Sequence, residues 1–153
     1  MKLIDGVKVK TLRLIPDERG WLMEILRSDD PDFRKFGQAY ITVAYPGVVK
    51  GWHYHRKQTD HFAVVSGMAK VVLYDDREGS ATRGIINEFF IGDLNPTLLI
   101  IPPFVIHGMK GIGTEPAILL NIPDQVYAYD NPDEFRIPPH GMDIPYDWEL
   151  KDG

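Results

Sequence analysis

Residues 47–67 read GVVKGWHYHRKQTDHFAVVSG and contain three of the five histidines in this 153-residue chain. Side chains two positions apart share one face of a β-strand, so His53 and His55 are expected to point the same way. A turn at 56–59 would return the chain on a neighbouring strand and bring Asp60 beside them. His107 follows a distant apolar run, IIPPFVI (100–106). The pattern predicts that polar residues from different strands converge on one interior cavity.

Short runs rich in Val, Ile, Tyr and Phe lie on both sides of this segment. Fourteen glycines and twelve prolines punctuate the chain, which disfavours long helices. The runs predicted to be strands are 8–15, 21–26, 38–45, 61–65, 69–74, 84–91, 97–101 and 118–122. Their spacing predicts an all-β antiparallel sandwich or jelly-roll barrel, formed by a single domain over residues 1–153. One short helical turn is expected at 28–35, and the tail from 123 onward is expected to wrap the surface.

Composition excludes several classes of protein. The net charge of −5 gives no broad positive field for nucleic-acid backbones, so no nucleic-acid partner is expected. The absence of cysteine excludes disulfide frameworks, thiolate zinc sites and cysteine nucleophiles. No apolar run approaches the roughly 20 residues of a membrane helix, and the N-terminus lacks the apolar core of a signal peptide. We therefore expect a cytoplasmic protein without a membrane partner.

The spacing within residues 47–67 resembles the first signature motif of the cupin barrels. The flanking glycines and the His-x-His pair take the usual positions, and Asp60 stands where those proteins usually have Glu. Pro102 and His107 resemble part of the second motif, although its usual Gly is Phe104 here. The resemblance implies a cupin-type jelly-roll barrel with its polar site inside.

Two functions are open for the histidines of this motif. One is a divalent-metal site, for which imidazole and carboxylate are suitable ligands; its ligands would be His53, His55, Asp60 and His107. The other is a site without metal in which His53 acts as a general base, since the pKa of histidine lies near neutrality. His140, in the proline-rich tail, is interpreted as a surface residue.

Five segments extend the pattern over nearly the whole chain. They read DERGWLMEI (17–25), FGQAYITVAYPGVVKGWHYH (36–55), LYDDREGSATRG (73–84), IPPFVIHGM (101–109) and IPYDW (144–148). Their order and spacing resemble those of the dTDP-4-dehydrorhamnose 3,5-epimerases, and the short chain resembles the spore-coat polysaccharide branch of that family. Those enzymes remove a proton beside the 4-keto group of a nucleotide-linked deoxyhexose and return it on the opposite face, at C3 and C5.

The resemblance implies a role for each matching residue, with His53 as the catalytic base. The matching substrate-binding positions are Arg19 and Glu24 at the nucleotide, Gln38 at the substrate, Lys50 beside the diphosphate and His107 at the ligand. Tyr127 matches the aromatic residue that stacks on the nucleotide's base, and Glu134 follows it in the chain. A nucleotide-diphosphate sugar is the implied partner, and no cofactor is expected. Because edge strands of such barrels are commonly covered, we also expect a homodimer.

Three positions depart from the family pattern. Asn121 replaces the tyrosine that serves as the acid, Asp60 replaces a lysine beside the sugar, and His55 replaces a glutamine. We still place all three in the site, His55 as a second catalytic histidine and the other two as substrate-binding residues. Since Asn121 is no proton donor, Tyr40, Tyr45 or a water is expected to supply the proton, with Tyr40 preferred.

These departures keep other functions open. The segment KGWHYHRK (50–57) resembles the R-G-x-H-x-H-K motif of the dTDP-sugar 3,4-ketoisomerases. A metal-dependent cupin enzyme and a non-catalytic sugar-nucleotide-binding module are two further alternatives. The acid that orients the base in the family lies in a C-terminal stretch that is shorter here, where Asp143 and Asp147 are candidates. The predicted function is an epimerase of deoxysugar and polysaccharide biosynthesis, without an essential metal.

Overall fold

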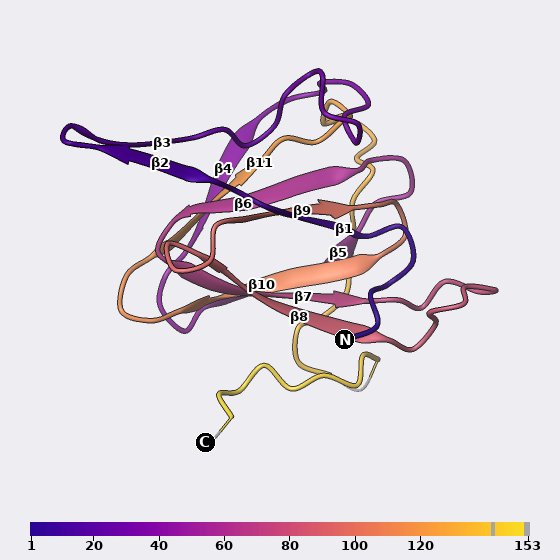
Figure 1. Ribbon diagram of the computed structural model, residues 1–153. Coiled ribbons are helices and arrows are strands. Elements are labelled where there is room, and N and C mark those ends of the chain that lie inside the picture. The colour runs from indigo at the N-terminus through magenta and orange to yellow at the C-terminus, as the bar shows by residue number, and fades with distance from the viewer. Residues whose placement is uncertain (142, 152–153) are drawn as a thin grey trace.

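The computed structural model describes residues 1–141 and 143–151 and contains twelve strands, with no helix in these ranges (Figure 1). In chain order the strands are β1 (Lys8–Thr11), β2 (Leu14–Asp17), β3 (Gly20–Met23), β4 (Tyr40–Ala44), β5 (Val49–Tyr54), β6 (Asp60–Ser66), β7 (Met68–Tyr74), β8 (Ile86–Gly92), β9 (Thr97–Ile101), β10 (Ile106–Ile112), β11 (Ala117–Asn121) and β12 (Phe135–Arg136). The expected all-β class is confirmed. Over the same ranges, no helix offers the length and apolarity needed to cross a membrane.

Ten of the strands form two five-stranded sheets that pack face to face. The first sheet has the order β1-β9-β6-β11-β4, and the second has the order β12-β5-β10-β7-β8. Every strand pair within them is antiparallel. β2 and β3 form a separate hairpin that projects from the first sheet (Figure 1). The architecture is therefore the antiparallel sandwich that the strand spacing predicts.

Alternation along each strand separates the interior from the outer faces. On β6, Phe62 and Val64 enter the core between the sheets, and Asp60 shares their face. Ala63 faces outward, where it packs beneath the segment that follows β3. Gly67 joins β6 to β7 with a φ of 71°, and a Cβ there would lie 2.4 Å from the Pro116 carbonyl oxygen. Only glycine fits this tight turn, which fixes the position of both strands.

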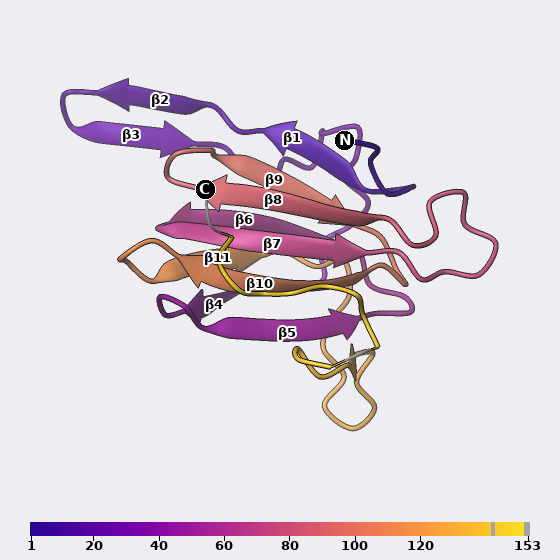
Figure 2. The ribbon, with the colours of Figure 1, turned by 90° about the horizontal axis from the view of Figure 1, so that it is seen from below.

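The C-terminal segment covers the outer face of the second sheet (Figure 2). Ile144 and Trp148 are buried there against Trp52 of β5, with the two indole rings 4.7 Å apart. Lys110 donates a hydrogen bond of 2.8 Å to the Trp148 carbonyl oxygen and holds the segment in place. The tail thus wraps the surface as expected, apart from the two residues of β12. It braces the strand that carries His53.

Several details of the sequence prediction are wrong. The strand predicted over 8–15 is two strands, β1 and β2, which belong to different sheets. Residues 28–35 form no helical turn; hydrogen bonds from Asp30 to the Arg27 carbonyl and from Phe33 to the Asp30 carbonyl close two successive turns instead. The apolar run before His107 belongs to the predicted strand 97–101 only at its start. It breaks at Pro102, and His107 lies inside β10, a strand that was not predicted.

Candidate active site

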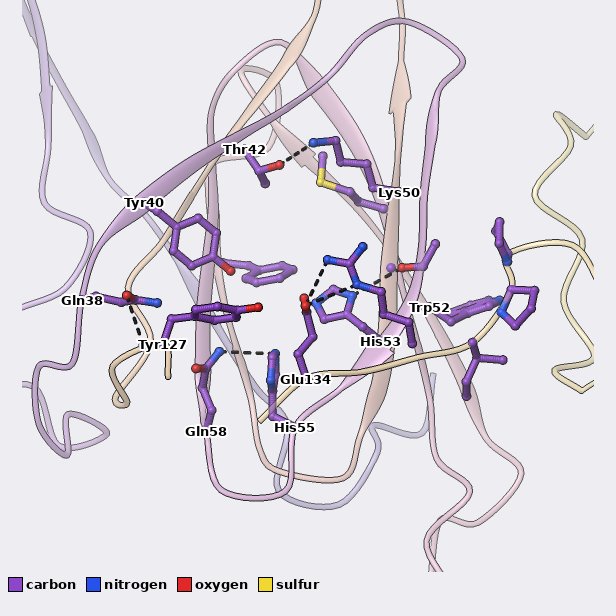
Figure 3. Close-up of a pocket in the computed structure, with 18 of the residues that line it drawn as sticks. Gln38, Tyr40, Thr42, Lys50, Trp52, His53, His55, Gln58, Tyr127 and Glu134 are labelled. Carbon is purple, nitrogen blue, oxygen red and sulfur yellow. Dashed lines mark hydrogen bonds and ion pairs between the residues drawn. The ribbon is translucent and has the colours of Figure 1, made fainter. Parts of the chain in front are cut away.

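A pocket of about 910 Å³ opens between β4 of the first sheet and β5 of the second (Figure 3). The segment between β11 and β12, and the residues after β12, form its remaining wall. Ligand pockets typically have volumes of about 300–1,000 Å³, so this one accommodates a nucleotide-sized ligand. The polar lining residues on which the argument depends are Gln38, Tyr40, Lys50, His53, His55, Gln58, Tyr127, Glu134 and Arg136.

Three histidines and one aspartate form a cluster that reaches the pocket through His53 and His55. One ligand-type atom from each lies within 4.8 Å of the others; the residues are His53, His55, Asp60 and His107. His53 lies in β5 and His107 in β10 of the second sheet, and His55 directly follows β5. Asp60 begins β6 of the first sheet and reaches the histidines from there. The His53 and His107 rings are 4.1 Å apart, since the two residues are direct partners in the β5–β10 register.

Each of these imidazoles turns its Nδ1 atom toward a main-chain carbonyl. His107 Nδ1 lies 2.9 Å from the Val105 oxygen, and His53 Nδ1 lies 3.4 Å from the Gly51 oxygen. His55 Nδ1 contacts the Asp133 oxygen. Because a carbonyl only accepts, Nδ1 is protonated in each ring, whether the ring is neutral or cationic. The Nε2 atoms of His55 and His107 therefore face Asp60 Oδ2, at 3.2 and 3.1 Å.

The second Asp60 oxygen is held by two amides. Gln58 and Asn121 each donate a hydrogen bond of 2.7 Å to Asp60 Oδ1. Asn121 Nδ2 also donates to the Tyr40 hydroxyl, at 2.9 Å. Since the Tyr40 oxygen accepts from Asn121, its own O–H proton is free to point into the pocket. Asn121, which stands where the family has its acidic tyrosine, thus orients a different tyrosine, Tyr40.

Burial and neighbouring charges set the protonation of these groups. Burial lowers the pKa of His53 to about 3, and the adjacent His107 adds to this effect, so the His53 imidazole is neutral. Burial alone would lower the pKa of His55, but the Asp60 carboxylate raises it. Burial alone would raise the pKa of Asp60, yet His107 and His55 hold it well below its usual value. Burial, with Asp60 nearby, raises the pKa of Tyr40 to about 12.

The four-residue cluster also fits a divalent cation. Asp60 Oδ2 and His107 Nε2 are buried without a hydrogen-bond partner, so their close approach lacks hydrogen-bond geometry. The Nδ1–carbonyl contacts are the kind that orient histidine ligands of metals. Three imidazoles and a carboxylate are suitable ligands for iron, manganese, nickel or zinc.

The structure places the residues expected at the site in three groups. Seven line the pocket: Gln38, Tyr40, Lys50, His53, His55, Tyr127 and Glu134. Three are buried behind its wall: Asp60, His107 and Asn121. Two lie elsewhere on the hairpin and its exit. Arg19 pairs with Asp17 at the exposed hairpin tip, and Glu24 pairs with Arg27.

Asp143 and Asp147, the candidates to orient the base, are not among the lining residues. Three residues at the site were not predicted. Gln58 binds Asp60, Asp133 holds His55, and Arg136 lies opposite His53 in the β12–β5 register. Gln58 lies within the predicted turn, but no local pattern distinguishes it. Asp133 and Arg136 reach the site only through the long return of the chain after β11.

Two packed antiparallel sheets with an interior histidine cluster define a cupin-type barrel. Within that class, the chain belongs to the family described as the polysaccharide biosynthesis C-terminal domain, whose model matches residues 15–135.

Two curated relatives match over nearly their whole length. The spore coat polysaccharide biosynthesis protein SpsL of Bacillus subtilis is 43% identical over 97% of this chain and 99% of its own. The probable low-salt glycan biosynthesis epimerase Agl13 of Haloferax volcanii is 43% identical over 99% of this chain and 98% of its own. The expected resemblance to the spore-coat polysaccharide branch is confirmed.

Solved structures agree with this assignment. A dTDP sugar isomerase from Desulfovibrio desulfuricans superposes with a TM-score of 0.91 at 37% identity, over 97% of this chain and 94% of that one. A dTDP-4-dehydrorhamnose 3,5-epimerase from Sulfolobus tokodaii superposes with a TM-score of 0.82 at 25% identity, over 99% and 85% of the two chains. The resemblance to the 3,5-epimerases is thus confirmed.

Proposed function

We propose that this protein is an epimerase of a nucleotide-linked 4-keto-6-deoxyhexose in polysaccharide biosynthesis. The observation that carries the proposal is the pairing of two groups suited to proton transfer, His53 and Tyr40, which enter one pocket from different sheets. Two similar proteins support the proposed substrate class and pathway. One is named a probable glycan biosynthesis epimerase, and the other is a dTDP sugar isomerase.

His53 is the base of the proposed reaction. The lowered pKa of His53 keeps its Nε2 atom unprotonated, although it also makes the ring a weaker base than free imidazole. This atom removes the proton from the carbon beside the 4-keto group, which becomes acidic because the carbonyl oxygen takes up the enolate charge. Tyr40 is the acid, because its high pKa keeps the hydroxyl protonated and its proton faces the pocket. Proton removal on one face and return on the other invert the carbon.

Two lining residues of the pocket suit a nucleoside diphosphate. Lys50 is one of them, and its Nζ atom donates a hydrogen bond of 2.6 Å to Thr42 (Figure 3). Tyr127 presents an aromatic ring for the base, and its main-chain N–H lies 3.4 Å from the Gln38 side-chain oxygen. We assign Lys50 to the diphosphate, Tyr127 to stacking on the base and Gln38 and Glu134 to further substrate contacts.

A homodimer would give Arg19 and Glu24 a role. The hairpin that carries Arg19 pairs with no other strand in residues 1–141 and 143–151, and its Trp21 and Leu22 are 57% exposed. Edge strand β4 exposes Ile41 in the same way. We propose that the hairpin of one subunit covers its partner, so that Arg19 and Glu24 reach the partner's nucleotide.

Mixed dimers test this arrangement. An Arg19→Ala chain combined with a His53→Asn chain should regain about a quarter of the wild-type activity after random exchange, because half of the mixed dimers' sites are then intact. A monomeric protein, or mixtures that remain inactive, would contradict a shared site. The cytoplasmic location stays a prediction.

Reaction in D₂O tests the proposed function itself. The protein is incubated with dTDP-4-keto-6-deoxyglucose, and the product is analysed by mass spectrometry and NMR. Deuterium at C3, C5 or both, with inverted configuration, is the expected result. A displaced keto group would instead indicate a ketoisomerase, and tight binding without any label would indicate a binding module.

The second candidate is a cation-dependent enzyme, which the unpaired Asp60 Oδ2 and His107 Nε2 atoms favour. A divalent cation held by the cluster would supply stabilisation of the enolate oxygen. Elemental analysis of the purified protein distinguishes the two candidates. About one metal per chain, with exchange activity lost on chelation and restored by the ion, supports this candidate. Full activity of a metal-free preparation rules it out.

A further inference from the structure

The turn between β5 and β6 is held by two carboxylates from the segment between β11 and β12. Asp133 accepts the main-chain N–H groups of Arg56, Lys57 and Gln58, at 2.9, 2.9 and 3.1 Å. Asp124 accepts the next N–H, that of Thr59, at 2.8 Å. Four consecutive donors of one turn are thus satisfied by residues more than 60 positions away.

Asp133 differs from Asp124 because it also contacts a histidine of the site. Its main-chain oxygen accepts the Nδ1 proton of His55. This contact fixes the tautomer and turns Nε2 toward Asp60 Oδ2, at 3.2 Å. The turn that Asp133 holds also presents Gln58, whose amide binds Asp60 Oδ1 and lies 3.3 Å from His55 Nε2.

We propose that Asp133 is a positioning residue: its carboxylate fixes the turn, and its carbonyl holds His55 in the tautomer that aims Nε2 at Asp60. The inference rests on the proposed function. In this proposal the His55 ring is oriented by the segment between β11 and β12, which also carries Tyr127. A displacement of about 1 Å in such a site costs up to ~100-fold in rate, so the clamp has a measurable consequence.

Lys50, on β5, and the part of the wall that follows Asp133 should be largely independent of this clamp. After Asp133, the wall segment is anchored by the pairing of β12 with β5 and by the ring of Phe135, which stacks on Tyr54 with centroids 5.1 Å apart. Arg56 also lies over the Phe135 ring, at 4.2 Å. Loss of the Asp133 side chain should therefore lower kcat by about 10- to 100-fold and change KM by about threefold or less.

Asp133→Ala is the main variant, and Asp124→Ala is its matched control. The control removes a cap from the same turn but contacts none of His53, His55 and His107. Nitrogen-15 NMR of the histidine rings, recorded above the titration of His55, reports which nitrogen carries the proton. We expect Asp133→Ala to shift His55 from the Nδ1–H form toward the Nε2–H form and to lower kcat. Asp124→Ala should lower the unfolding temperature and leave the His55 signal unchanged.

Asp133→Asn keeps one acceptor oxygen and serves if the alanine variant does not fold. It should shift the His55 signal in the same direction by a smaller amount. An unchanged His55 tautomer in a folded Asp133 variant overturns the inference. So does an equal shift of the His55 signal in the Asp133 and Asp124 variants. The NMR measurement needs no substrate. An inactive wild-type protein would therefore count against the proposed function alone.

Discussion

Replacing Tyr40 with phenylalanine should separate exchange of the substrate proton from inversion of the carbon. His53 remains in the variant and still removes the proton, but the opposite face loses its donor. The enolate then recovers a proton from the His53 side, so solvent deuterium enters without a change of configuration. Formation of the epimer should fall by about 10²- to 10⁴-fold, the usual contribution of one general acid.

The fold should tolerate this change. Tyr40→Phe removes one neutral hydrogen bond, the 2.9 Å contact from Asn121 Nδ2. One N–H of the Asn121 amide keeps its 2.7 Å bond to Asp60 Oδ1, and only the other loses its partner. The free energy of unfolding should therefore fall by about 1 kcal/mol. Binding of dTDP should be unchanged, because the lost hydroxyl faces the sugar end.

The assay follows dTDP-4-keto-6-deoxyglucose in D₂O by NMR, which reports label and configuration in one spectrum. Tyr45→Phe is the matched control, because Tyr45 is 69% exposed and does not line the pocket. It should invert the carbon at the wild-type rate. Inversion at that rate by Tyr40→Phe would refute the assignment of the acid. Equal loss of exchange and inversion, with dTDP binding intact, would also refute it.

Three other predictions concern binding and stability. Lys50→Ala should raise KM by about tenfold or more with little effect on kcat in steady-state kinetics, since the diphosphate contact is equal in ground and transition states; the reverse pattern would contradict it. Trp148→Ala should lower the free energy of unfolding in urea by about 3–5 kcal/mol, because the indole is buried against Trp52; a loss below 1 kcal/mol would mean that the tail does not brace β5. Asp75→Asn should flatten the acid dependence of stability: burial alone would raise the pKa of Asp75, but hydrogen bonds from Arg77, Ser80 and Thr82 lower it below the usual value of an aspartate. The stabilisation from Asp75 is thus complete above about pH 4 and is lost as the pH falls, so urea titrations of wild type and variant should differ in slope only below that pH.

Local periodicity was sufficient to predict the central part of the fold and the cluster. The two-residue repeat places His53 and His55 on one face, and the turn after them returns Asp60 to the same cavity, where the structure places it. His61 takes the outer face, where its Nδ1 atom bonds the Ile122 carbonyl oxygen at 2.8 Å. These relations hold because strand alternation is a property of the backbone.

The second motif was harder to interpret because its backbone is unusual. Phe104 has a φ of 65°, a left-handed conformation that favours glycine and that the cupin motif normally fills with glycine. Pro102 ends β9 shortly before it, and β10 begins at Ile106. Glycines within β10 further conceal that strand, since they normally mark turns.

Contacts between distant segments left no local signal. Asp133 acts on a turn 75 to 77 positions earlier, and nothing in its neighbours predicts that pairing. Arg19 shows the converse, since a matching motif placed it at the nucleotide and the structure places it on an exposed hairpin. One chain viewed alone does not contain the surface against which that hairpin would pack.

The central claim is that His53 removes the sugar proton, and its most direct test is the rate of deuterium entry into the substrate with His53→Asn. Asparagine keeps roughly the shape of the side chain but has no basic nitrogen. The account predicts that label enters dTDP-4-keto-6-deoxyglucose at least ~10²-fold more slowly than with the wild-type protein, while affinity for dTDP is retained. Entry of label at the wild-type rate would contradict it.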